Sequence, residues 1–295
     1  MLVGRLLFFV LRTLFLHYYG RKIVPTKRII LVHTWIEISK TALLNNYELF
    51  QRQAGQSTIM PVIKSNAYGH GLEQVALILK EKAPKWVGVN SLFEARLLRR
   101  LNIESEILIL GPTFKEDLEE IAALNLRFML GHMDLLLFWL TMKKPPICHI
   151  KIDTGMSRQG FTVDSIRLAA EKIAASKSGF TNVEAIATHF ANVEDVTEHE
   201  YAQKQLKEFD EARGVLVSRG FSGFAHAASS ASALILPESC FDVVRVGISL
   251  YGLWPSKATK ISYLQGNRNL LNLRPVLSWK SKVSALKNVG MGSYI

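Results

Sequence analysis

Short apolar runs alternate with amphipathic stretches along most of the chain. Eight of these runs have the apolar, β-branched character of buried strands, and they begin at Ile59, Trp86, Ile107, Arg127, Cys148, Val183, Phe224 and Asp242. Between most of them lie segments with apolar residues at helical spacing, such as LEQVALILKEK and SIRLAAEKIAAS. Because strand and helix alternate at spacings of roughly 20 to 40 residues, the pattern predicts an α/β fold of the (β/α)8 TIM-barrel type, not an open doubly wound sheet.

The pattern changes at both ends of this repeat and divides the chain into three predicted regions. Residues 1–33 form an apolar and basic extension, residues 34–255 the barrel, and residues 256–295 the start of a β-rich C-terminal domain. Beyond Trp254, strand-like pieces such as PVLSWKSKVSALKNV replace the helical spacing. About 40 residues are too few for a β-domain that is stable alone, so we expect a C-terminally truncated second domain.

The N-terminal extension is apolar but interrupted by Arg5 and Arg12, so it holds no unbroken run of the ~20 residues that span a bilayer. No small-residue cleavage site follows it, which argues against a signal peptide. Three interpretations remain: an interfacial amphipathic anchor, the remnant of a larger upstream membrane or fusion partner, and upstream sequence translated from an early start codon. The last is favoured because a recognisable domain begins at Thr34, and membrane contact through residues 1–33 stays the weaker alternative.

The net charge of +11 at first suggests a nucleic-acid partner. The excess of positive charge lies in residues 1–33 and from residue 256 onward, where no Asp or Glu occurs. In the middle of the chain the acidic residues slightly outnumber the basic ones. No basic groove interleaved with aromatic residues is visible, so nucleic-acid binding is not expected. The two cysteines, Cys148 and Cys240, are far apart and suggest neither a disulfide nor a metal site, and they fit a reducing cytoplasm.

A barrel enzyme keeps its reactive groups at the C-terminal ends of its strands, so those positions carry the candidate chemistry. Lys64 leaves the apolar run IMPVIK directly into the loop SNAYGHG, where partial desolvation lets a lysine lose its proton and act as a nucleophile. A lysine at a strand end more often simply meets solvent, so the position alone does not decide. The later strands end in the motifs KIDTGMSRQGF, THF, HAASSAS and VRVGISLYG.

Together these motifs resemble those of the alanine racemase family. VIKSNAYGHG closely resembles the segment that carries that family's cofactor lysine, and the other motifs follow in the family's order from about Thr34 to the C-terminus. The resemblance implies a barrel enzyme that uses pyridoxal 5'-phosphate, in which Lys64 bonds the cofactor covalently and serves as one of two catalytic bases. It also implies that Tyr68 hydrogen-bonds the cofactor phosphate, and that the family's C-terminal domain supplies the second base to the partner subunit.

The resemblance also assigns roles to the fifth and sixth strands. Arg158 would meet the cofactor's phenolic oxygen and the substrate carboxylate, since a guanidinium pairs with a carboxylate in a fixed geometry. Lys151 would hold that arginine, and in the family this lysine is often carbamylated. His189 would stack against the pyridine ring, although a lone histidine on an apolar strand is otherwise more often a core residue.

The last two strands would hold the cofactor's phosphate and ring nitrogen. Ser230 and the backbone N–H groups of Gly247 and Ile248 would form a phosphate cup, as is common after the seventh and eighth strands of barrels. Ser229 stands where the family commonly has asparagine, and its shorter side chain reaches less far toward the cofactor. Arg245 would leave the pyridine nitrogen unprotonated, so that the substrate carbanion is less delocalised and regains its proton at the same carbon. Such a site suits racemisation.

We therefore expect a cytoplasmic isomerase, a homodimer when full length, that interconverts L-alanine and D-alanine for peptidoglycan synthesis. Its activity would be impaired in a chain that ends at Ile295. Two alternatives stay open: a membrane-associated serine racemase, and a non-catalytic pyridoxal-phosphate carrier like the single-domain barrel relatives. The start of a second domain after Trp254 argues against the carrier. No metal is expected.

Overall fold

The strands of a computed structural model of the chain form a barrel. The model describes residues 34–194, 199–266 and 271–281, and the barrel belongs to a compact unit from Ile36 to Ser278. Within the described residues, eight parallel strands follow one another: β2 (Thr58–Pro61), β3 (Trp86–Val89), β4 (Glu106–Ile109), β5 (Arg127–Leu130), β6 (Cys148–Lys151), β7 (Val183–Ala187), β8 (Phe224–His226) and β9 (Val243–Val246).

Hydrogen bonds join these strands around a ring. Strands β3 to β8 form one sheet in sequence order, and β2 pairs with β9 in parallel. A parallel bridge between Val62 and Gly88 connects β2 to β3. On the other side, the N–H of Arg245 in β9 donates to the carbonyl of Ala228, just after β8, at 3.1 Å. All eight predicted strands are confirmed, each beginning within one residue of its predicted start, and so is the barrel.

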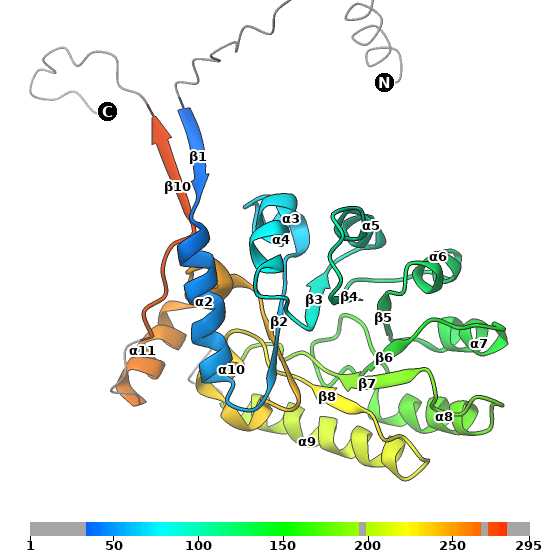
Figure 1. Cartoon of the computed structure of the whole chain (residues 1–295). Helices are drawn as coiled ribbons and strands as arrows, with labels where there is room; N and C mark the ends of the chain where they lie inside the picture. The colour runs from blue at the N-terminus through cyan, green and yellow to red at the C-terminus, as the bar shows by residue number, and fades with distance from the viewer. Residues whose placement is uncertain (1–33, 195–198, 267–270, 282–295) are drawn as a thin grey trace, which may run out of the picture. The chain divides into compact units, whose positions relative to one another are not determined.

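Helices lie along the outside of the strands in Figure 1. They are α2 (Lys40–Gln53), α3 (Lys64–Tyr68), α4 (Leu72–Lys80), α5 (Leu92–Arg100), α6 (Leu118–Ala123), α7 (Met133–Thr141), α8 (Val163–Ala174), α9 (His199–Val217), α10 (Ser232–Ile235) and α11 (Lys257–Gly266), with short 3-10 turns η1 (Lys115–Asp117), η2 (Pro237–Ser239) and η3 (Ile248–Tyr251). Side-chain oxygens cap some of them, as Ser39 does for α2 and Thr162 for α8.

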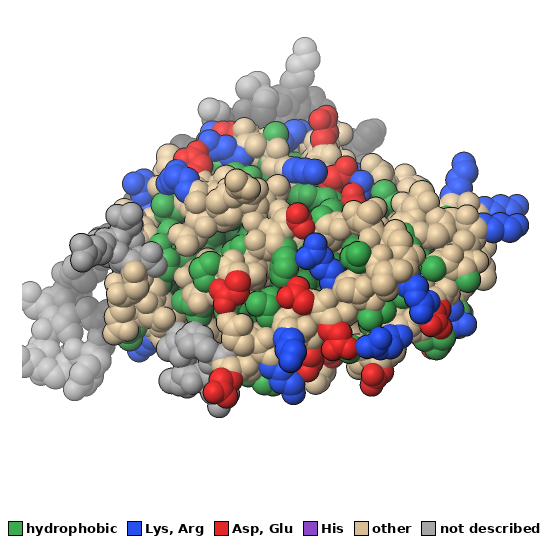
Figure 2. Space-filling view, turned by 90° about the horizontal axis from the view of Figure 1, so that it is seen from below, with side chains coloured by type: hydrophobic (Ala, Val, Ile, Leu, Met, Phe, Trp, Pro, Cys, Tyr) green, Lys and Arg blue, Asp and Glu red, His purple; other side chains and the backbone are tan. Residues whose placement is uncertain are grey.

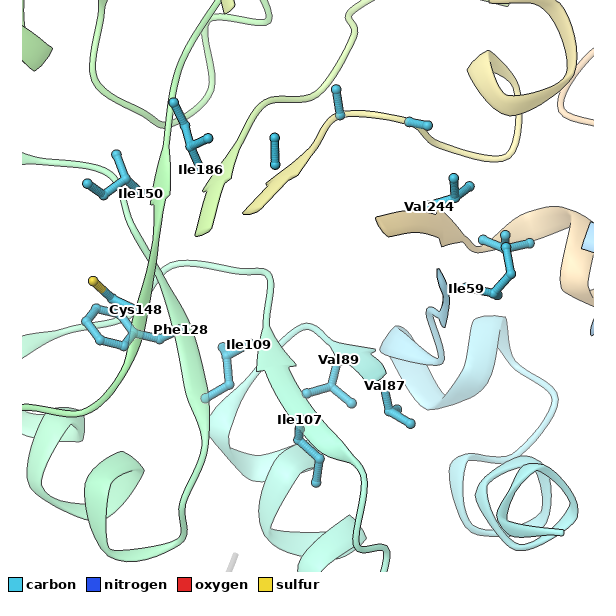
Figure 3. Close-up of a cluster of buried hydrophobic side chains, with 14 of the residues drawn as sticks. Ile59, Val87, Val89, Ile107, Ile109, Phe128, Cys148, Ile150, Ile186 and Val244 are labelled. Carbon is cyan, nitrogen blue, oxygen red and sulfur yellow. The ribbon is translucent and has the colours of Figure 1, made fainter. Parts of the chain in front are cut away.

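Side chains along each strand alternate between two hydrophobic clusters, as the period of a strand requires. The cluster on the barrel's inner face is made of Met60, Trp86, Leu108, Met129, Ala187 and Val243. The neighbouring strand residues belong to the larger cluster between strands and helices, and Figure 3 shows several of them, including Ile59, Val87, Ile107, Phe128 and Val244. The near-continuous apolar runs of the sequence therefore serve two separate packing layers.

Three polar side chains share the inner face with this apolar cluster. His149 and Lys151 occupy alternate positions of β6, and Arg245 lies two residues after the inward-facing Val243 in β9. All three are buried. Burial of charged or polar groups is costly unless they find partners, so these residues are held by hydrogen bonds that also organise the site.

The surface of the described residues carries charges of both signs. Figure 2 shows Lys and Arg side chains intermixed with Asp and Glu on one face of the molecule. Within the described residues, no helix is long and apolar enough to cross a bilayer. The predicted extension, residues 1–33, lies outside the described residues.

The segment after Trp254 differs from its sequence prediction. We expect strand-like pieces without a helix, but α11 occupies Lys257–Gly266. Ser256 caps it by accepting the N–H of Thr259 at 2.9 Å, and Tyr263 packs its ring 5.8 Å from that of Trp254. The apolar periodicity of α11 is weak, because individual tertiary contacts anchor the helix in place of an apolar stripe. Besides packing on Trp254, Tyr263 donates its hydroxyl to Oε1 of Gln53 at 3.1 Å. Strand β10 (Leu277–Ser281) follows and pairs with β1 (Thr34–Ile38). The domain boundaries at 33 and 255 stay a prediction.

Candidate active site

All of the site residues predicted from the sequence line one cavity. The cavity has a volume of about 620 Å³ and lies at the C-terminal ends of the strands. Its lining includes Lys64, Tyr68, Lys151, Arg158, His189, Ser229, Ser230, Arg245, Gly247 and Ile248. A volume of this size is typical of sites for small molecules and cofactors.

Lys64 and Tyr68 reach the cavity from the two ends of an unusual turn. Helix α3 has left-handed backbone at Ser65, Asn66 and Ala67, each with φ 54°, and Tyr68 has φ 53°. Left-handed backbone costs a residue with a Cβ roughly 1–2 kcal/mol. Four such residues in succession therefore need contacts from outside the turn to hold them.

The amine of Lys64 has a lowered pKa. Burial is the main cause, and the positive charges of Arg158 and Arg245 add to it, while the carboxylate of Glu94 acts in the opposite direction. A lower pKa leaves more of the amine unprotonated near neutral pH. Lys64 is thus suited to act as a nucleophile and as a base.

Tyr68, Ser230 and Gly247 meet on one part of the cavity wall. A Cβ built on Gly247 would lie 2.4 Å from the hydroxyl oxygen of Tyr68, so only glycine lets the tyrosine come this close. The N–H of Gly247 donates to Oγ of Ser230 at 3.0 Å. These groups lie at the start of η3, where backbone N–H groups of a first helical turn lack helical partners.

Arg245 is fixed by four backbone and side-chain acceptors. Nη1 donates to Nδ1 of His226 at 2.6 Å and to its carbonyl at 2.9 Å. Nη2 donates to the carbonyls of Thr188 at 2.7 Å and Ala227 at 2.9 Å, and lies 3.3 Å from Nδ1 of His189. Burial, with a further effect of Arg158, lowers the pKa of Arg245 to about 10, so it stays charged at neutral pH.

His189, one of two histidines among the described lining residues, is neutral. Burial lowers the pKa of His189 well below its ordinary value, and the positive charges of Arg245, Arg158, Lys151 and Lys64 lower it further. A neutral imidazole presents an uncharged ring face to the cavity. His189 can therefore pack against a flat ligand without adding to the positive charge there.

Lys151 lies inside the barrel with its amine bonded to a carbonyl. Nζ donates to the backbone oxygen of Ile152 at 2.6 Å, and the side chain is almost fully buried. Burial, then the charges of Arg245 and Arg158, lowers the pKa of Lys151 to about 7, although Asp153 opposes them. A substantial fraction of this lysine is therefore unprotonated near neutral pH.

The lining is strongly positive and fits pyridoxal phosphate by its donor set. Arg158 and Arg245 are cations, Lys64 and Lys151 add positive charge in their protonated forms, and Glu194 is the carboxylate among the described lining residues. Such a cavity attracts an anion, and the hydroxyls of Tyr68 and Ser230 can hydrogen-bond a phosphate. Among the described residues, no group of three or more His, Cys, Asp or Glu side chains could hold a metal ion.

Two details of the phosphate wall differ from the simplest expectation. The N–H of Gly247, expected to face the phosphate, already donates to Ser230. The backbone N–H of Ser229 donates to Oγ of Ser232 at 2.7 Å, and the two hydroxyl oxygens are 3.4 Å apart. Ser229 lines the cavity but is tied to its own loop.

Part of the cavity wall was not singled out from the sequence. It comes from the segments that follow strands β3, β4 and β5, and from Gln159 next to Arg158. The residues of those segments are Asn90, Leu110, Gly111, Pro112, Thr113, Gly131 and His132. These residues carry no catalytic motif. Their position directly after predicted strands is the sequence signal that could have found them, because all strands of a barrel end at the same rim.

The fold and the cavity define a (β/α)8-barrel protein with a cavity that is lined by basic side chains and built around a partly desolvated lysine. The family model described as the alanine racemase N-terminal domain matches residues 38–255. An alanine racemase of Leptospira interrogans is 38% identical over 269 residues, which cover 89% of this chain and 68% of that protein. One of Carboxydothermus hydrogenoformans is 35% identical, covering 88% and 68%.

Solved structures give the same result. The alanine racemase of Bacillus anthracis with bound L-Ala-P superimposes with a TM-score of 0.75 at 30% identity, covering 89% of this chain and 67% of that one. The alanine racemase of Clostridium difficile in complex with cycloserine gives a TM-score of 0.77 at 28% identity, covering 88% and 70%. This chain belongs to the alanine racemase family.

Proposed function

We propose that the protein is a pyridoxal-phosphate-dependent isomerase that interconverts L-alanine and D-alanine. The observation that carries the proposal is the convergence of Lys64, Tyr68, Arg158 and Arg245 on one positive cavity. The cofactor and the substrate both bear anionic groups, a phosphate and a carboxylate, that such a cavity attracts. The bound alanine analogue of the B. anthracis relative supports the choice of substrate.

Each end of the cofactor has its own set of residues. Lys64 would form the covalent bond to it, and Tyr68 and Ser230, with the backbone at Gly247 and Ile248, would hold its phosphate. Arg245 would serve the ring nitrogen, and His189 would pack against the ring. Ser229 contributes a short hydrogen-bonding side chain beside Ser230. The cofactor, when bound, supplies an electron sink for the charge that develops on the substrate's α-carbon.

The residues of the chain orient the substrate and move its proton. Arg158 pairs with the carboxylate of alanine and fixes which bonds of the α-carbon face Lys64. The Lys64 amine, when it is free, would take or return the α-proton on one face. Arg245 cannot accept a proton, so it keeps the ring nitrogen unprotonated. This favours return of the proton to the α-carbon over its loss to side reactions.

Lys151 supports Arg158 in this proposal. The unprotonated amine of a lysine is the form that reacts with carbon dioxide, and burial lowers the pKa of Lys151 to about 7. Carbamylation would convert a cation into an anion between Arg158 and Arg245. That charge would hold Arg158 in place for the substrate carboxylate.

The cellular setting follows from the reaction. D-Alanine is a building block of peptidoglycan, which places the reaction in the cytoplasm ahead of cell-wall assembly. A homodimer would bring a second subunit to the mouth of each barrel. The chain spans 68% of the length of the L. interrogans relative, so both points concern the family's full-length enzyme.

The test incubates the full chain with pyridoxal phosphate and one enantiomer of alanine in D2O. Racemisation should produce the other enantiomer and place deuterium on the α-carbon, and Lys64→Ala should do neither. L-Serine in a parallel reaction measures the preference between the two amino acids. Cofactor binding without exchange or inversion would contradict the proposal and favour a carrier.

A further inference from the structure

Glu94 is a buried carboxylate behind the left-handed turn of α3. It is the third residue of α5, it is only 8% exposed, and its N–H lies 3.4 Å from the hydroxyl of the cap residue Ser91. In a capping box, a glutamate at this position returns to the N–H of the cap residue. The carboxylate of Glu94 reaches other partners instead.

The two oxygens of Glu94 bind two separate segments. Oε1 accepts the N–H of Asn66, in the middle of the left-handed turn, at 3.3 Å, and Oε2 accepts the N–H of Asn90, just after β3, at 2.7 Å. A carboxylate accepts at both oxygens, whereas an amide accepts at one and donates at the other. Glu94 thus ties the turn to the end of the adjacent strand in a way that glutamine cannot reproduce.

Among the described residues, the other contacts that support the turn are neutral. The side-chain oxygen of Asn66 accepts the N–H of Leu72 at 2.8 Å. The ring of Tyr251 stacks on His70 at 4.3 Å and packs against Tyr68 at 5.3 Å. Hydrogen bonds to a charged acceptor are about twice as strong as neutral ones of equal geometry. Among these contacts of the turn, Glu94 is the charged acceptor, and its Oε1 lies 3.3 Å from the backbone nitrogen of Asn66.

The carboxylate is also a negative charge beside Lys64. Lys64 faces the positive charges of Arg158 and Arg245, and Glu94 is the group that opposes them. The other titratable groups of the cavity wall are Tyr68, His132, Lys151, His189 and Glu194. Glu94 therefore acts on Lys64 in two ways. It hydrogen-bonds the turn that follows the lysine, and its negative charge interacts with the lysine's amine.

We propose that Glu94 is a positioning residue: it fixes the turn that carries Lys64 and Tyr68, and its charge offsets the repulsion of the Lys64 ammonium by Arg158 and Arg245. The inference rests on the proposed function in taking Lys64 as the reactive group. Glu94 touches neither cofactor nor substrate, and it acts through the turn.

The first test measures the charge, on the full chain freed of cofactor. Competitive acetylation over a pH series, read by mass spectrometry of the Lys64 peptide, gives the titration midpoint of Lys64. Glu94→Gln removes the negative charge at nearly constant size, so the midpoint should fall by roughly 0.5 to 1 unit. The matched control is Glu119→Gln, which removes an exposed carboxylate from the first turn of α6 and should leave the midpoint unchanged.

The second test measures the reach of the side chain. Glu94→Asp keeps the charge but is one methylene shorter and cannot span both N–H groups. The Lys64 midpoint should stay within about 0.3 units of the parent chain, while the affinity for pyridoxal phosphate should fall about tenfold through loss of a charged hydrogen bond. Circular dichroism confirms that both variants are folded.

Three results would overturn the proposal. One is an unchanged midpoint in Glu94→Gln, which would make Glu94 an ordinary helix-terminal residue. Another is a midpoint that rises toward that of a solvated lysine, which would mean that the turn has opened to water. The third is full cofactor affinity in Glu94→Asp. Neither test requires turnover, so the expected shifts in a chain that does not racemise alanine would support the role of Glu94 and contradict the proposed function.

Discussion

Nη1 of Arg245 lies 2.6 Å from Nδ1 of His226, and this contact determines which ring nitrogens carry hydrogen in a buried series of hydrogen-bonded side chains. Arginine only donates, so Nδ1 of His226 accepts and its Nε2 carries the hydrogen. That nitrogen lies 2.9 Å from Nδ1 of His149, whose Nε2 is 3.2 Å from Oε2 of Glu184. Each side chain of the series therefore donates to the next one, from Arg245 at the cavity to Glu184 near the start of β7. In this arrangement both histidines are neutral.

Neutral buried histidines make stability depend on pH. Burial lowers the pKa of His226 and of His189 well below the ordinary value, and that of His149 also falls, because Glu184 only partly opposes its burial. Below pH 6.5 the unfolded chain binds protons that the folded chain does not, so stability present above that pH is lost as the pH falls. Each histidine contributes a slope of up to about 1.4 kcal/mol per pH unit.

Urea unfolding at steps between pH 6.5 and 5 measures this slope. In this window ordinary carboxylates contribute little. Lys151, whose pKa in the folded chain is about 7, is mostly protonated at pH 6.5 and almost fully protonated at pH 5, so it adds only a small part of the slope. His226→Phe should reduce the slope by about one histidine's share, whatever its effect on absolute stability. A free energy of unfolding that is flat over the window would contradict the neutral assignment.

Lys64 should be the residue that bonds pyridoxal phosphate, because its lowered pKa supplies the unprotonated amine. The loaded chain should show a visible absorbance band that borohydride abolishes, with the label fixed on the Lys64 peptide. Lys64→Ala should lose the band, whereas Lys143→Ala, at an exposed position, should keep it. A label mapped to another lysine would refute the site assignment.

Gly247→Ala should weaken cofactor binding through a steric clash alone. The added Cβ would lie 2.4 Å from the hydroxyl oxygen of Tyr68, and the backbone of Gly247, with φ −104°, does not itself require glycine. We expect affinity for pyridoxal phosphate to fall by about tenfold or more, as for loss of one hydrogen bond to a charged group. Fluorescence titration measures it.

Two variants control this experiment. Gly214→Ala adds a Cβ with nothing within 4 Å and should bind the cofactor normally. Adding Tyr68→Phe to Gly247→Ala removes the clashing oxygen and should restore folding stability but not phosphate affinity. Equal affinities for Gly247→Ala and the parent chain would show that Tyr68 is free to move away.

Arg245→Glu should shift the reaction toward transamination in a chain that racemises alanine. A carboxylate at the ring nitrogen keeps it protonated, which strengthens the electron sink and lengthens the life of the carbanion. Pyruvate formed per alanine inverted should rise, and thermal unfolding checks the cost of losing the bonds to Thr188 and Ala227. If the ratio of pyruvate to inverted alanine stays constant in a folded variant, Arg245 does not contact the ring.

The sequence by itself determined the barrel and the strand ends that carry the site. Apolar runs such as the one before Lys64 have no alternative to burial in a parallel sheet, and parallel strands end at one rim, so the motifs after them converge. It did not predict α11, because that helix depends on Ser256 and on the contact of Tyr263 with Trp254 and has only a weak apolar stripe.

Tertiary structure alone decided how the site residues are supported. Glu94 lies 28 residues from Asn66 in sequence, and His149 lies 77 from His226, yet hydrogen bonds join both pairs. Glu94 has the sequence pattern of an ordinary helix start, and His149 that of a histidine in an apolar strand. Their roles arise from neighbours across the fold, because hydrogen bonds and charge interactions in a buried site depend on distance in space, which local sequence patterns do not encode.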